Sequence, residues 1–74
     1  MKPMAMLIYA HLAANRDRAI PANEFLRVFS TVDYRSRISE IRKHLRELNS
    51  PYRIESKRIK GQRTNEYRLT METP

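Results

Sequence analysis

The sequence has 74 residues, no cysteine and a formal net charge of +7. A chain of this length forms one domain with a small core, so we expect a single domain over residues 1–74 with a loose tail at 71–74. The lack of cysteine excludes disulfides and thiolate metal sites, which fits a reducing cytoplasm. The positive charge is concentrated, because residues 35–63 hold ten basic side chains against three acidic ones. This local excess of positive charge indicates an anionic partner, and nucleic acid is favoured over a membrane surface.

The first predicted element is a helix over residues 4–14, which carries no formal charge and is rich in helix formers. The segment follows Lys2 as a signal peptide would, but cleavage would remove the most apolar part of a small core, and it is too short to span a bilayer. We expect a core helix, with partial burial in a homodimer as the alternative. The residues predicted to contact a second copy or a partner protein are Met4, Leu7, Ile8 and Tyr9.

A second short helix is predicted over residues 22–29, after a polar loop at 15–18 and one or two bridging strand residues at 19–21. Its start is weakly capped, because Asn23 is the nearby side chain that can accept a hydrogen bond. The side chains expected to face inward are Leu26 and Phe29, with Phe25 near them.

Residues 30–33 separate this helix from a longer one, a spacing typical of a helix-turn-helix. Thr31 or Asp33 is expected to cap the longer helix, and Val32 to fill the space between the two helices as an apolar plug. The longer helix should end at residues 49–51, because Asn49 tolerates a left-handed conformation and Pro51 cannot continue a helix.

The longer helix has one apolar side and one basic side. Spacings of four and three residues predict a buried stripe of Tyr34, Ile38, Ile41, Leu45 and Leu48. Glu40 and Glu47 occupy an edge of their own, where we expect salt bridges. The opposite side gathers basic and hydroxyl side chains: Arg35, Ser36, Ser39, Arg42, Lys43 and Arg46. Because the charges are sorted by sign, we predict a DNA recognition helix rather than a solvated basic face, with Arg46 on phosphate.

A β-hairpin is predicted from strands at 52–59 and 64–70, whose apolar residues alternate with charged ones. Gly61 lies at the tip, where a positive φ is needed. Ile59 is out of phase with Ile54, which predicts either a bulge near residues 56–58 or an exposed apolar residue at the hairpin end. The hairpin side chains expected to contact DNA are Lys57, Arg58, Lys60, Gln62 and Arg63. The alternative is that these charges protect the sheet edge from aggregation.

The predicted order is that of an α+β winged helix-turn-helix, with three helices and a C-terminal two-stranded β-hairpin wing. The runs that carry this likeness are Ile20-Pro21, Arg37-Ile-Ser-Glu-Ile-Arg42, Tyr52-Arg-Ile-Glu55, Gly61 and Tyr67-Arg-Leu69. Together they resemble the small winged helix-turn-helix proteins of bacteriophages and prophages. The sequence departs from that pattern at Pro21, where a Ser or Thr cap is usual, and at Ile41, where Leu is usual.

We therefore expect a duplex-DNA-binding protein, a phage-type transcriptional regulator or architectural factor, in the cytoplasm of a bacterium or phage-infected host and associated with the nucleoid. The main rival is a protein-interaction module that binds a host protein through its basic surface or its uncharged first helix. A double-stranded RNA or Z-form binder is a weaker third hypothesis. Stacking of Tyr34, Tyr52 and Tyr67 on unpaired bases is less favoured than core packing.

No enzyme, cofactor, metal or small-molecule substrate is expected. His11 and His44 lie far apart and lack a third ligand, and the sequence holds no glycine-rich phosphate loop or nucleophile motif.

Overall fold

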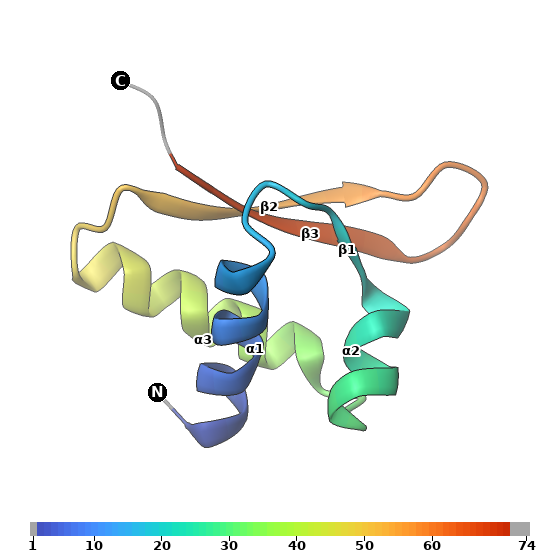
Figure 1. Cartoon of the computed structure of the whole chain (residues 1–74), viewed down its shortest axis with the longest axis horizontal. Coiled ribbons are helices and arrows are strands. Elements are labelled where there is room, and N and C mark those ends of the chain that lie inside the picture. Colours follow the sequence, from blue (N-terminus) through green and yellow to red (C-terminus); the bar gives the residue numbers. More distant parts are fainter. Residues whose placement is uncertain (1, 72–74) are drawn as a thin grey trace.

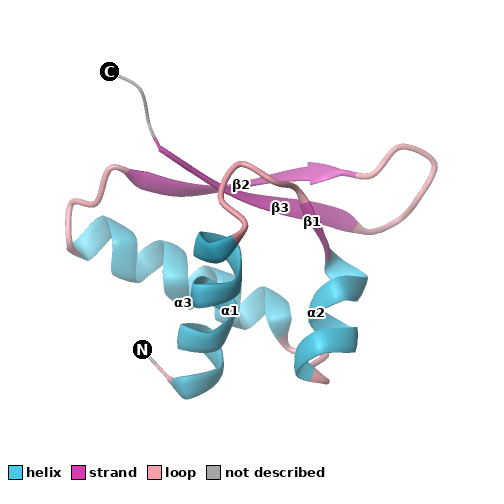
Figure 2. Cartoon of the chain, viewed as in Figure 1, coloured by secondary structure: helices cyan, strands magenta, loops and turns pink. Residues whose placement is uncertain are grey.

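The computed structural model describes residues 2–71, and over this range it has three helices and three strands. The elements follow in the order α1 (Pro3–Ala14), β1 (Ile20–Pro21), α2 (Ala22–Phe29), α3 (Tyr34–Glu47), β2 (Tyr52–Arg58) and β3 (Asn65–Met71). The strands form an antiparallel sheet in the order β1-β3-β2, and the helices lie on one side of it (Figures 1 and 2). The α+β class is therefore confirmed. Within residues 2–71, no helix combines the length and the apolar character needed to cross a bilayer.

The sheet has three strands, whereas a two-stranded hairpin was predicted. The bridging residues expected at 19–21 form β1, in which Ile20 pairs with Tyr67 and Pro21 with Glu66 of β3. The expectation of a loose tail from residue 71 is also wrong at Met71, because Met71 ends β3 opposite Tyr52. The remainder of that predicted tail, residues 72–74, lies outside the described residues.

Of the two alternatives predicted for Ile59, the bulge near residues 56–58 is wrong. The pairing of β2 with β3 runs without interruption from Tyr52 opposite Met71 to Arg58 opposite Asn65. Ile59 continues this ladder, because its N–H donates to the Thr64 carbonyl at 3.0 Å, and its side chain is half-buried at the end of the hairpin. Gly61 has a φ of 79° in the connecting loop, as predicted from its place at the tip.

The core lies between the helices and the inner face of the sheet. Three aromatic rings meet at its centre: the ring centroids of Phe25 and Tyr34 are 6.0 Å apart, those of Phe25 and Tyr67 are 5.9 Å apart, and those of Tyr34 and Tyr67 are 6.1 Å apart. These contacts join α2, the start of α3 and β3. The other buried apolar side chains are Ala5, Ile8, Leu12, Ile20, Ala22, Ile38, Ile41, Leu45, Ile54 and Leu69.

Three residues predicted to be inside are exposed. Leu26 is 40% exposed, because α2 turns Phe25 toward the core and the next position is about 100° further round the helix. Val32 is 86% exposed, so it does not fill the space between α2 and α3. Leu48 is 63% exposed, because α3 ends at Glu47 and the chain turns away at Asn49, whose φ of 52° is left-handed as predicted.

Neither predicted cap bonds the first amides of α3. Thr31 Oγ1 accepts a hydrogen bond from the Asp33 N–H at 3.2 Å, and the Asp33 carboxylate accepts one from Arg37 at 3.3 Å. The start of α2 has no side-chain cap either, so Asn23 does not fill that role. Both helices therefore depend on tertiary packing rather than on capping.

Glu24 is a buried charged residue that links α1 to α2, and it is 8% exposed. Its Oε2 atom contacts His11 Nε2 in α1 and accepts a hydrogen bond from Arg18 Nη2 at 3.2 Å. Arg27 adds an ion pair at 3.8 Å. The hydrogen bond with His11 is the largest cause that holds the pKa of Glu24 below its usual value; burial opposes the shift, and the charge of Arg18 supports it.

This arrangement makes stability depend on pH. Because the pKa of Glu24 is lower in the folded chain than its usual 4.5, the ionised carboxylate stabilises the fold above that pH and ceases to do so as the pH falls through the folded-state pKa. Glu24→Gln should therefore lower the free energy of unfolding at about pH 6, and this deficit should shrink as the pH falls below 4.5 and through the folded-state pKa of Glu24. Urea denaturation over a pH series would measure both effects. Glu55→Gln, at an exposed pair with Arg68, is the control, and a Glu24→Gln deficit independent of pH would refute the assignment.

Candidate nucleic-acid interface

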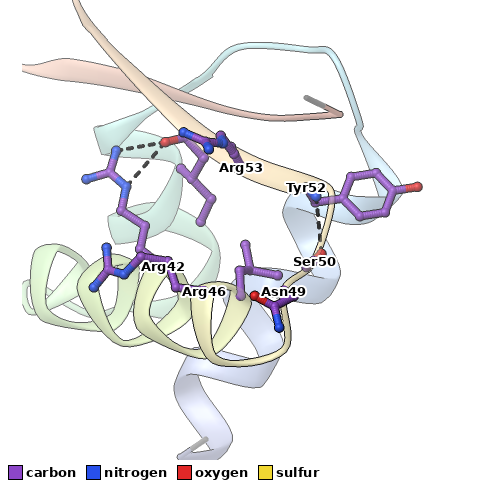
Figure 3. A pocket seen from close by; sticks show the side chains of 8 residues that line it. Arg42, Arg46, Asn49, Ser50, Tyr52 and Arg53 are labelled. Carbon is purple, nitrogen blue, oxygen red and sulfur yellow. Dashed lines mark hydrogen bonds between the residues drawn. The ribbon is translucent and has the colours of Figure 1, made fainter. Parts of the chain in front are cut away.

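Two clefts lie between α3 and the hairpin, and Arg42 lines both of them. The N-terminal cleft, near the start of α3, has a volume of about 360 Å³. It is lined by Arg35, Ile38, Ser39, Arg42, Ser56, Arg58, Arg63, Asn65 and Tyr67. The C-terminal cleft, at the end of α3, has a volume of about 440 Å³ and is drawn in Figure 3. It is lined by Arg42, Leu45, Arg46, Asn49, Ser50, Tyr52, Arg53 and Ile54.

The spacing of residues along α3 and along β2 explains which side chains line the N-terminal cleft. On α3, Arg35, Ser39 and Arg42 are four and three residues apart, which places them on one flank of the helix. On β2, Arg58 is an even number of residues from the buried Ile54, so both point to the same face of the sheet. The flank of α3 and the inner face of the hairpin therefore meet in one cleft.

Most carboxylates are paired away from this cleft. Arg37 binds both Asp33 and Glu40 at 3.3 Å, and Arg68 binds Glu55 at 2.7 Å on the outer face of the sheet. These pairs confirm the salt bridges predicted at the acidic edge of α3, where Lys43 also lies 4.0 Å from Glu47. The acidic side chains thus neutralise arginines on the flanks of the molecule.

The arginines of the N-terminal cleft lack such partners. Within residues 2–71, Arg35, Arg58 and Arg63 have no ion pair with a carboxylate. The guanidinium of Arg35 lies 6.0 Å from the ring centroid of Tyr34, a cation–π contact that does not neutralise its charge. Three arginines crowded without an acidic partner create a strong local positive potential, which favours a bound anion.

Arg42 differs from these residues because its guanidinium is already engaged. Its Nε and Nη2 groups both donate to the Ile54 carbonyl, at 3.2 and 2.9 Å (Figure 3). Ile54 is in β2, so this side chain connects α3 directly to the backbone of the hairpin. Arg42 therefore separates the two clefts.

The C-terminal cleft is polar around its rim and apolar at Leu45 and Ile54. Ser50 Oγ accepts a hydrogen bond from the Tyr52 N–H at 3.1 Å, which fixes the turn between α3 and β2. The Tyr52 hydroxyl accepts a hydrogen bond from Arg16 at 2.7 Å, so its ring is held toward the loop after α1. Arg46, predicted for phosphate contact, borders this cleft and not the N-terminal one.

The other predicted DNA-contact residues lie outside both clefts. Ser36 and Lys43 are exposed on α3, and Lys60 and Gln62 are exposed in the hairpin loop. Lys57 pairs with Glu66 across the sheet, one position from Arg58, and so faces the opposite side of the hairpin. Among the predicted residues, the structure gathers a smaller group in the N-terminal cleft: Arg35, Ser39, Arg42, Arg58 and Arg63.

Several of the residues that line the clefts were not predicted from the sequence. Ser56 and Asn65 border the N-terminal cleft, and Asn49 and Arg53 border the C-terminal one. Strict alternation along β2 would have placed Ser56 beside the α3 flank, but the predicted bulge interrupted that alternation.

The candidate partner surface on α1 is smaller than predicted. Ile8 is fully buried and cannot contact a partner, because Ala5, Ile8 and Leu12 form the stripe that faces the core. Met4 and Tyr9 are half-buried against that core. Leu7 is 53% exposed, and Met6, which was not predicted, is 56% exposed.

Comparison with known proteins yielded no match, whether to family models, to curated proteins or to solved structures.

Proposed function

We propose that this chain is a winged helix-turn-helix protein that binds duplex DNA, a phage-type regulator or architectural factor. The observation that supports the proposal most is the N-terminal cleft, where arginines of α3 and of the hairpin come together without carboxylate partners. The segregated charge of the sequence supports it independently, because the excess over the whole chain resides in residues 35–63.

In this proposal α3 enters the major groove with its exposed side. Arg35 and Ser36 lie at its start, where base edges are usually reached, and Ser39 and Lys43 extend the same surface. Arg35 can donate to both guanine acceptors, and serine can bond either kind of base. Arg46 lies on phosphate further along the helix.

The hairpin is the wing, placed on the DNA backbone. Arg58 and Arg63 face the cleft beside α3, and Lys60 and Gln62 extend from the loop toward the backbone or the adjacent minor groove. Lys57, on the opposite face, contributes only to the long-range field that attracts DNA.

Affinity for duplex DNA should fall steeply with salt. If about six basic residues neutralise phosphates, the logarithm of the binding constant should decrease with the logarithm of the salt concentration with a slope of roughly five. Fluorescence anisotropy with a labelled duplex at several salt concentrations would measure this slope.

A slope near zero, or no binding at low salt, would contradict the proposal of DNA binding. That result would favour the alternative, a module that binds a host protein. Single-stranded DNA and duplex RNA, measured at the same salt, would show whether the preference is for duplex DNA.

Arg35→Ala and Arg63→Ala should have different effects on binding. Loss of Arg35 should relax sequence preference by about 1–3 kcal/mol at one base pair, whereas loss of Arg63 should weaken binding to all sequences alike. Competition between selected and random duplexes would separate the two effects. Arg68→Ala is the matched control, because Arg68 pairs with Glu55 on the outer face of the sheet and should not contact DNA. If Arg68→Ala weakened binding as much as Arg63→Ala, only net charge would matter.

A further inference from the structure

β2 is an edge strand, because the sheet order is β1-β3-β2. One row of its backbone groups therefore has no strand partner. The Ile54 carbonyl is occupied instead by the guanidinium of Arg42, through two N–H groups at 3.2 and 2.9 Å. The bond joins α3 to the third residue of β2, in the half of the hairpin that lies away from its loop.

The outer half of the hairpin has few other attachments to the helices. Ile54 is the buried side chain of β2, and from Glu55 to Arg58 every side chain of that strand is exposed. On β3 the last buried contact before the loop is Tyr67, opposite Ser56. Nearer the loop, β3 is held by the contact of Tyr67 with Tyr34 of α3 and by the pairing of Glu66 with Pro21 of β1. On β2 the attachment to α3 is the bond from Arg42 to Ile54, so the position of Arg58 and Arg63 beside α3 depends on that bond together with the contacts of β3.

We propose that Arg42 is a positioning residue for DNA binding, which holds the hairpin so that Arg58 and Arg63 lie beside Arg35. The proposal rests on the proposed DNA-binding function and changes the role expected for Arg42 within it. The guanidinium directs two of its donors to one carbonyl, and this orientation fixes the hairpin. Arg42 thus acts through the wing.

This role requires the shape of arginine as well as its charge. Lysine has the same charge, but its single ammonium group on a flexible chain cannot reproduce the two directed N–H groups. Arg42→Lys should therefore weaken duplex binding about tenfold, which corresponds to a lost charged hydrogen bond. Arg68→Lys is the matched control, because Arg68 bonds Glu55 on the outer face of the sheet, lines neither cleft, and should leave duplex binding unchanged.

A double-mutant cycle separates positioning from a general structural role. Arg63→Ala should cost clearly less affinity in the Arg42→Lys background than in the unchanged chain, because the displaced wing no longer uses Arg63. Lys43→Ala, on α3 itself, should cost the same in both backgrounds. All variants are compared at a temperature where circular dichroism shows each to be folded.

Equal costs of Arg63→Ala in both backgrounds would overturn the proposal, and so would full affinity of Arg42→Lys. A reduction of both the Arg63 and the Lys43 effects would also overturn it, because that result indicates a general loss of structure. Failure of the proposed function itself looks different: the unchanged chain would then show no salt-dependent binding to the duplex.

Discussion

The contact of Phe25, Tyr34 and Tyr67 is the packing constraint on which the functional surface depends. Their ring centroids lie 5.9–6.1 Å apart, and they come from α2, the first turn of α3 and β3. They hold the start of α3 against the sheet, so Arg35, next to Tyr34, is brought to the hairpin. The hairpin is then fixed to α3 a second time through Arg42 and Ile54. Two attachments along α3 define the N-terminal cleft.

The paired and unpaired charges occupy different parts of the molecule. Acidic residues pair with arginines on the flanks, such as Asp33 with Arg37 and Glu55 with Arg68, while Arg35, Arg58 and Arg63 remain without carboxylates in the described part of the chain. Like charges held close together destabilise a small fold through self-repulsion, and a bound polyanion relieves that repulsion. Under the proposed function, a bound duplex should therefore stabilise the fold.

Local patterns in the sequence predicted the elements well but not their attachments. The apolar stripe of α3, the left-handed Asn49 and the positive φ of Gly61 are local features; the last two are confirmed, and the stripe is confirmed from Tyr34 to Leu45 but not at Leu48. The phase of Ile59 left two alternatives open, a bulge or an exposed apolar residue at the hairpin end; the ladder has no bulge, and Ile59 is half-buried at its end. The bond from Arg42 to a carbonyl twelve residues away leaves no local signal, so the cleft could be predicted only as a list of residues on separate elements.

The central claim is that α3 and the hairpin present one common surface to DNA. Titration of the ¹⁵N-labelled chain with a short duplex, followed by NMR, tests it most directly. The account predicts that the amide signals of Arg35, Ser39, Arg58 and Arg63 shift together, while those of Met6 and Leu7 on α1 stay in place. Shifts concentrated on α1, or confined to only one of α3 and the hairpin, would contradict it.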